Sequence, residues 1–119
     1  MRMDVVVMAF VGVVDPLDPR IDPLLEHSTS AYIHAGDPHV DEWRGIVDGD
    51  ALVAVGARVG AAHGRAHLVS ICTDPAYRGR GLATALLGET LAYLDGVVET
   101  VKLDATAAGE PLYRKLGFV

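Results

Sequence analysis

The chain has 119 residues, of which 50% are hydrophobic and 22% are charged, so we expect one globular domain over residues 1–119. Its formal net charge of −6 argues against a nucleic-acid binder, which needs a basic face, and its longest apolar run, Val5–Val14, is too short to cross a membrane. The single cysteine excludes an internal disulfide, and without a recognisable signal peptide we expect a cytoplasmic protein.

The first predicted elements are a strand and a helix. The valine-rich run Met3–Val14 is continuous rather than alternating, which is typical of a buried strand. The Asp-Pro pairs that follow hold the backbone extended. Asp22 can cap a helix that has Pro23 in its first turn, and we expect this helix to run to about Ile33.

Three short strands are predicted next. They cover Trp43–Val47, Ala51–Val59 and Ala66–Thr73, and the turn signals "DGD" at Asp48–Asp50 and "GAAHGR" separate them. Turns this short join neighbouring strands that run in opposite directions. The three segments are therefore expected to form an antiparallel meander.

The last third of the chain alternates helix, strand and helix. From Arg80 or Gly81 to about Leu94, apolar residues recur at three- and four-residue intervals, which predicts an amphipathic helix. Val98–Ala105 is predicted as a strand, and "GEPLYRKLGF" contains a short helix. The whole order indicates an α/β or α+β domain with a mixed sheet.

The stretch "DPAYRGRGLATALL" places alternating glycines and arginines where a strand gives way to a helix. A helix N-terminus presents unpaired N–H groups and a positive dipole end, which favours an anion. Gly79 and Gly81 let a phosphate approach those amides, and Arg78 and Arg80 add positive charge. The alternative is that the glycines only shape a turn and the arginines are solvated. Neither a P-loop nor the dinucleotide-binding fingerprint fits the spacing.

These residues resemble a known family. "ICTDPAYRGRGLATALL" is similar to the acetyl-CoA-binding motif Arg/Gln-x-x-Gly-x-Gly/Ala of the GNAT superfamily of N-acetyltransferases, which Arg78, Gly81 and Ala83 fill. "PLYRKLGF" at Pro111–Phe118 resembles the second signature of that superfamily. The resemblance implies a GNAT-like mixed, mostly antiparallel sheet flanked by helices. It also implies that the chain ends, at Val119, before the last two strands of that fold.

The resemblance assigns a cofactor site and a reaction. The strand before the loop would part from its neighbour and bind the pantetheine arm of acetyl-CoA through the backbone of Ile71, Cys72 and Thr73. The pyrophosphate would lie on the loop and first helical turn, at Gly79, Arg80, Gly81, Leu82, Ala83 and Thr84. A small-molecule or peptide amine would attack the thioester directly, without a metal. Cys72 has no identifiable partner to make its thiolate, so we do not assign it as a nucleophile.

Two side chains are candidates for proton transfer. Tyr113 matches the family tyrosine that often protonates the departing thiolate, and its alternative role is to cover the seam between helix and sheet. His67 lies on the strand before the expected separation, where by alternation it shares a face with Val69 and Ile71. Its imidazole suits a general base, but a half-exposed structural histidine is equally compatible with the pattern.

Other polar residues have weaker assignments. His34, His39, Asp41 and Glu42 follow no zinc-binding spacing and are typical of a polar loop, where the family often recognises its acceptor. Trp43 nearby could line that pocket or belong to the core. "DATAAGEP" lacks the asparagine with which many members bind pantetheine, and neither Asp104 nor Thr106 is an obvious substitute.

Two alternatives follow from the expected end of the fold. A last strand at Val98–Ala105 would have an open edge, from which we expect a homodimer that covers it. The alternative function is a non-catalytic acyl-CoA-binding or regulatory domain that retains the cofactor loop.

Overall fold

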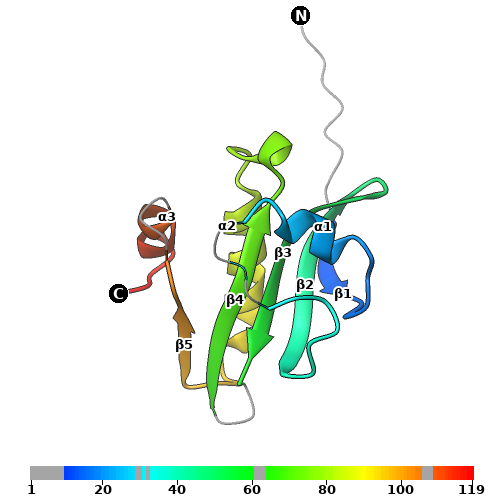
Figure 1. The fold of residues 1–119 in the computed structure, drawn as a ribbon. Helices are drawn as coiled ribbons and strands as arrows, with labels where there is room; N and C mark the ends of the chain where they lie inside the picture. The colour runs from blue at the N-terminus through cyan, green and yellow to red at the C-terminus, as the bar shows by residue number, and fades with distance from the viewer. Residues whose placement is uncertain (1–9, 29–30, 32, 61–63, 106–108) are drawn as a thin grey trace, which may run out of the picture.

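A computed structural model describes residues 10–28, 31, 33–60, 64–105 and 109–119 (Figure 1). Its centre is a five-stranded sheet in the order β1-β2-β3-β4-β5. The strands are β1 (Phe10–Val14), β2 (Val40–Asp48), β3 (Ala51–Val59), β4 (Arg65–Thr73) and β5 (Thr100–Leu103). All neighbouring pairs are antiparallel except β4 and β5, which are parallel. The predicted mixed, mostly antiparallel sheet is therefore confirmed.

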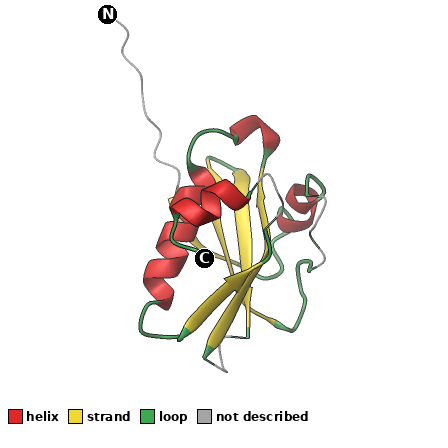
Figure 2. Ribbon diagram, turned by 90° about the vertical axis from the view of Figure 1, so that its left-hand side faces the viewer, coloured by secondary structure: helices red, strands yellow, loops and turns green. Residues whose placement is uncertain are grey.

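The helices lie on both faces of this sheet (Figure 2). They are α1 (Ile21–Leu25), the long α2 (Leu82–Leu94) and the short α3 (Glu110–Lys115), and a short 3-10 helix, η2, covers Pro75–Tyr77. The helix α2 follows β4 and returns the chain to β5, as the parallel pairing requires. Among the described residues, no helix has the length and apolarity needed to cross a membrane.

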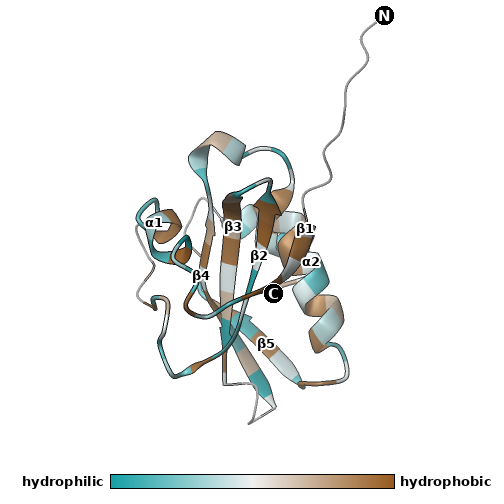
Figure 3. Cartoon of the chain, turned by 90° about the vertical axis from the view of Figure 1, so that its right-hand side faces the viewer, coloured by the Kyte–Doolittle hydropathy of each residue, from teal (hydrophilic) through white to brown (hydrophobic). Residues whose placement is uncertain are grey.

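The core has a layer on each side of the sheet. On the α1 face, Ile21 and Leu24 pack with Trp43, which is 1% exposed, so Trp43 is a core residue. On the α2 face, Leu86, Leu87 and Leu94 pack against the strands. Hydrophobic parts of β2 and β3 lie between the two helical layers (Figure 3). This double burial explains why their apolar runs are nearly continuous in the sequence.

Some predicted boundaries were wrong. The helix α1 ends at Leu25 instead of reaching Ile33, and Arg20 rather than Asp22 precedes it. Asp22 instead accepts a hydrogen bond from the backbone N–H of Ala35 (2.9 Å), which holds the following segment against the helix. The polar residues after Glu26 are poor helix formers, so this contact prevails over the periodicity. The strand β2 is longer than predicted.

The ends of two other predicted strands also need comment. For the first strand, residues 3–9 lie outside the described residues, and β1 covers the remainder of that prediction. The strand β5 begins only at Thr100, because Val98 makes an isolated bridge with Asp95 at the turn that follows α2. The helix α2 agrees closely with the prediction from periodicity.

Candidate functional site

The strands β4 and β5 separate part-way along β4. Their parallel pairing joins Arg65–Leu68 to Thr100–Leu103 and stops there. The strand β4 continues to Thr73, while the chain after β5 moves away toward α3 (Figure 1). Within the described residues, the backbone of 69–73 therefore has no β5 partner. This is the separation that the resemblance implied, and it leaves the edge groups of β4 available to a ligand.

A β-bulge lies at the start of this free edge. Ser70 has a positive φ of 52°, and the β3–β4 register passes from Ala57↔Val69 to Val55↔Cys72, so β4 holds one extra residue. The Ser70 hydroxyl donates a 2.8 Å hydrogen bond to the Ile33 carbonyl, which anchors the bulge to the segment after α1. A non-glycine residue in this region of φ is strained, and it keeps this conformation only where its surroundings fix it.

The bulge changes which side chains share a face. Val69 and Cys72 belong to the core layer on the α1 face, whereas Ile71 packs on the α2 face. The expectation that His67, Val69 and Ile71 share one face was therefore wrong for Ile71. Simple alternation fails because the extra residue reverses the side-chain direction after Ser70.

The loop between β4 and α2 has the conformation that its glycines permit. Asp74 accepts a 2.9 Å hydrogen bond from the Ala76 N–H and starts η2. Gly79 and Gly81 have φ of 78° and 75°, and a Cβ built on either meets no atom within 4 Å. Gly81 precedes α2 without a capping side chain among the described residues, and the first helical bond runs from Ala85 N–H to Gly81 C=O. The amides of 82–84 consequently point out of the helix end without intrahelical acceptors.

A cavity of about 330 Å³ lies at this helix end. It includes seven residues that the sequence assigned to the cofactor site: Thr73, Arg78, Gly79, Gly81, Leu82, Ala83 and Thr84. The structure thus brings the loop, the helix start and the end of β4 around one hollow.

Other residues of the cavity were not predicted, and some predicted ones are not in its lining. Tyr77 and Leu112 also line the cavity. They were not assigned to the site from the sequence, although each lies within one of the two quoted motifs. Ile71, Cys72 and Arg80 do not line the cavity. Arg80 instead lies over the Tyr77 ring, 4.8 Å from its centroid, and donates to the Ala76 carbonyl. Arg78 donates from Nε to the Thr73 carbonyl (3.4 Å) and so connects the loop to the end of β4.

Cys72 is a packing residue in this geometry. Its thiol is buried and donates to the Leu24 carbonyl at a sulfur–oxygen distance of 3.4 Å. Burial raises the pKa of the Cys72 thiol, and the nearby Arg78 offsets this only in part. A thiol kept protonated is a poor nucleophile. The structure therefore agrees with leaving Cys72 out of the chemistry.

Tyr113 lies on α3, on the α2 side of the sheet. It is half-buried, packs against the cluster that contains Leu68 and Leu87, and meets Phe118 edge-on at 6.3 Å between ring centroids. Burial raises the pKa of the Tyr113 phenol, which therefore keeps its proton at neutral pH. Its neighbour Leu112 lines the cavity, so α3 forms part of the same wall.

His67 occupies the next-to-last position at which β4 pairs with β5, one residue before the separation. It is aligned with Lys102 of β5 and Val59 of β3. Its Nε2 is 3.3 Å from a carboxylate oxygen of Asp104, the first residue after β5. Sequence analysis did not predict this contact, because it joins residues that are distant along the chain.

Comparison with known proteins agrees with this geometry. The family described as acetyltransferase (GNAT) domain matches residues 42–119, which span β2 to the end of the chain. The chain belongs to the GNAT acetyltransferase family. That family membership supports acyl transfer as the general activity and acyl-CoA as the general kind of donor.

Solved acetyltransferase structures share the fold at low sequence identity. An acetyltransferase from Trypanosoma brucei has a TM-score of 0.75 at 21% identity, with 94% of this chain and 93% of that one covered. Ribosomal-protein-alanine N-acetyltransferase from Brucella melitensis has a TM-score of 0.75 at 17% identity, with 94% and 92% covered. Glucosamine-6-phosphate N-acetyltransferase from Arabidopsis thaliana has 0.72 at 13%, with 95% and 92% covered. The search of curated proteins gives no significant match.

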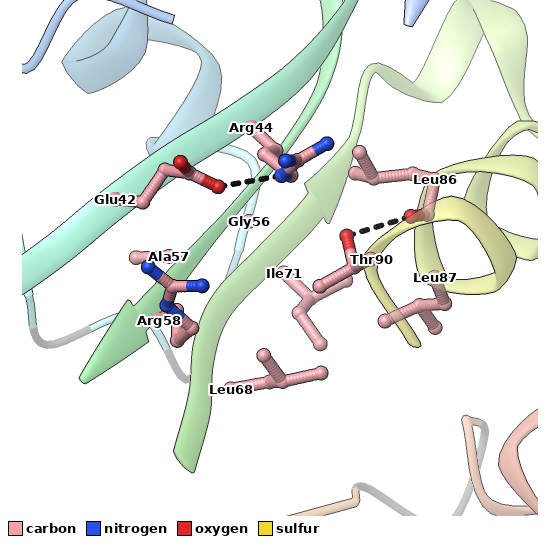
Figure 4. A pocket seen from close by; sticks show the side chains of 10 residues that line it. All are labelled: Glu42, Arg44, Gly56, Ala57, Arg58, Leu68, Ile71, Leu86, Leu87 and Thr90. Atoms are coloured by element: carbon pink, nitrogen blue, oxygen red, sulfur yellow. Dashed lines mark hydrogen bonds and ion pairs between the residues drawn. The ribbon is translucent and has the colours of Figure 1, made fainter. Parts of the chain in front are cut away.

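A second cavity in this GNAT chain lies between the sheet and the middle of α2 (Figure 4). Its volume is about 20 Å³, enough for a single water molecule and far too small for a coenzyme. Its lining is largely apolar, and Arg44 is held there between Glu42 and Glu89. This cavity belongs to the packing of α2 on the sheet.

The polar loop before β2 forms separate local pairs. The Nδ1 atom of His34 lies 3.6 Å from Oδ1 of Asp22, and Nδ1 of His39 lies 3.1 Å from Oδ1 of Asp37. Glu42 instead pairs with Arg44 on β2. Among the described residues, no group of three or more histidine, cysteine and acidic side chains is arranged to hold a metal ion.

Proposed function

We propose that this GNAT-family chain transfers an acetyl group from acetyl-CoA to a primary amine, by direct attack of the amine on the thioester. The observation that carries the proposal is the continuity between the open helix end and the free edge of β4. Thr73 ends the free edge and also lines the cavity at the start of α2. A ligand with a phosphate group at one end and an extended arm has a place for each part.

The cavity at the start of α2 suits a pyrophosphate. The amides of Leu82, Ala83 and Thr84 lack intrahelical acceptors, and the positive end of the helix dipole adds to their attraction for an anion. Open space at Gly79 and Gly81 lets phosphate oxygens come close to the backbone. Arg78 adds a positive charge at the rim. These features fit acetyl-CoA better than they fit a neutral ligand.

The free edge of β4 suits the pantetheine arm. Beyond Leu68 this edge has no β5 strand beside it, so Ile71, Cys72 and Thr73 would bind the arm through main-chain atoms, in addition to the contact that the Thr73 carbonyl makes with Arg78 Nε. The acetyl thioester supplied by the coenzyme would then lie near the point of separation. There a backbone N–H of the bulged segment would stabilise the oxyanion that develops on the carbonyl.

Tyr113 and His67 would move protons on opposite faces of the sheet. Tyr113 packs on the α2 face, and its buried phenol is protonated at neutral pH, as a donor to the departing thiolate must be. His67 alternates with Ala66 and Leu68, which pack on the α2 face, so it points to the other face. In this arrangement the amine approaches from the His67 side and the thiol leaves on the Tyr113 side.

The test separates a transferase from a binding domain. Calorimetry should show saturable binding of acetyl-CoA, and a panel of amines should then release CoA thiol, read with a thiol reagent. The chain's only cysteine is buried, so the protein contributes little background. Binding without thiol release for any amine class would favour the non-catalytic acyl-CoA-binding domain. Absence of binding would overturn the cofactor assignment.

A further inference from the structure

The point where β4 and β5 separate brings a histidine and a carboxylate together. His67 occupies the next-to-last paired position of β4, and Asp104 follows directly on the last residue of β5. The His67 side chain is 28% exposed and that of Asp104 is 73% exposed. The pair thus lies at the inner end of the free edge, where the proposed function places the thioester.

Both side chains point to the same face of the sheet. Val101 and Leu103 of β5 pack on the α2 face, as do Ala66 and Leu68 of β4. The residues between them in each strand point the other way, so His67 and Lys102 share the face opposite α2. Asp104 follows β5 directly, and its contact with His67 brings its carboxylate to the same side. Lys102 is the β5 residue aligned with His67, so its ammonium group is a second charged group on this face.

The contact favours a proton on one of the two imidazole nitrogens. Asp104 Oδ2 lies 3.3 Å from His67 Nε2. This nitrogen is buried and has no hydrogen bond from the described residues, so a small rotation of the exposed Asp104 side chain would complete one. An ionised carboxylate can only accept a hydrogen bond, so a bond between Asp104 and His67 requires the proton on Nε2. In the neutral imidazole this leaves the lone pair on Nδ1.

We infer that Asp104 is a positioning residue, which holds His67 in the Nε2–H form so that Nδ1 acts as the base toward the attacking amine. This inference rests on the proposed function. Nδ1 takes a proton from the amine, directly or through one water molecule, while the amine nitrogen bonds to the acetyl carbon. The carbon–sulfur bond breaks and the thiolate takes the Tyr113 proton. Asp104 stabilises the imidazolium until solvent removes its proton, and the Tyr113 phenolate regains a proton from solvent, which returns both residues to their starting states.

Three substitutions test the inference. Asp104→Ala removes the acceptor, while Asp104→Asn keeps an oxygen that can accept from Nε2–H. Glu99→Gln is the matched control, since it removes a carboxylate from the exposed start of the same segment. We expect Asp104→Ala to lower kcat at least tenfold without changing the Kd for acetyl-CoA. Asp104→Asn should recover a substantial part of kcat, and Glu99→Gln should match the parent.

A spectroscopic measurement tests the orientation without turnover. Two-bond ¹⁵N–¹H correlation spectra distinguish the two tautomers of neutral histidine, and the His67 signals are assigned by their loss in His67→Gln. We expect the Nε2–H form in the parent and in Asp104→Asn, and a shift toward the Nδ1–H form in Asp104→Ala. The same spectra show whether each variant is folded.

The outcomes separate the inference from the proposed function. If the parent releases thiol with an amine and Asp104→Ala keeps its full kcat, the inference is wrong and the proposed function stands. An Nδ1–H tautomer in the parent would also overturn the inference. If the parent binds acetyl-CoA but acetylates no amine, the proposed function fails, whatever the tautomer of His67.

Discussion

Replacing Gly81 with aspartate places a carboxylate at the mouth of the proposed pyrophosphate site. Gly81 lines the cavity, and a Cβ there meets no atom within 4 Å, so the structural cost of the new side chain comes from the left-handed backbone (φ 75°) and not from a contact of its Cβ with a neighbour. A carboxylate about 6 Å from a phosphate charge costs from about 0.7 to about 3 kcal/mol, depending on the effective dielectric constant. We therefore expect the affinity for acetyl-CoA to fall at least tenfold, which corresponds to about 1.4 kcal/mol.

Gly96 offers a matched control for this substitution. It follows the other end of α2, its φ of 79° is close to the 75° of Gly81, and its Cβ position is equally open. The left-handed backbone penalises a side chain at both positions, by about 1–2 kcal/mol for an ordinary residue and less for aspartate. An acidic residue is also less favourable at a helix C-terminus than at its N-terminus. The Gly96→Asp protein should therefore lose at least as much stability.

The assay is calorimetric titration of acetyl-CoA into the parent and both variants, after thermal unfolding has established their stabilities. We expect Gly96→Asp to bind like the parent and Gly81→Asp to bind at least tenfold more weakly. Unchanged binding in a folded Gly81→Asp protein would refute the location of the pyrophosphate site. Equal losses in both variants would attribute the effect to destabilisation of α2.

Three further predictions concern the proton-transfer residues and the sheet edge. Tyr113→Phe should lower kcat more than it changes the Kd for acetyl-CoA, and equal rates for both proteins would return Tyr113 to a packing role. Because burial raises the pKa of Tyr113, the parent's rate should not decline between pH 7 and about 9 through loss of this proton. His67→Ala should flatten or displace the ascending limb of the pH profile of kcat/KM, and an unshifted limb with a normal rate would exclude His67 as the base. The outer edge of β5 has no partner strand among the described residues, and Lys102 is the only charged residue in β5, so we predict a homodimer through this edge. Sedimentation as a stable monomer at micromolar concentration would contradict it.

The features that sequence predicted well depend on local patterns. The conformation of the loop follows from residues close together in the chain, because Gly79 and Gly81 adopt a positive φ, which glycine tolerates without the steric penalty that other residues incur. The helix α2 is long enough for its periodicity to locate it. The separation of β4 and β5 and the location of Tyr113 came from the family resemblance, which two separated motifs carried.

The features that sequence missed depend on contacts between distant residues. The bulge at Ser70 is held by the Ile33 carbonyl, and no alternation pattern shows where one extra residue enters a strand. The end of α1 depends on the hydrogen bond between Asp22 and Ala35. The approach of Asp104 to His67 follows from the parallel register of β4 and β5, which neither strand's sequence specifies by itself.

A crystal structure of the chain with acetyl-CoA tests the central claim most directly. We predict the pyrophosphate on the backbone amides of Gly79–Thr84, the pantetheine arm along the free edge of β4, and the thioester between Tyr113 and the His67–Asp104 pair. Coenzyme bound elsewhere on the molecule would contradict the claim, as would a thioester directed away from the point where β4 and β5 separate.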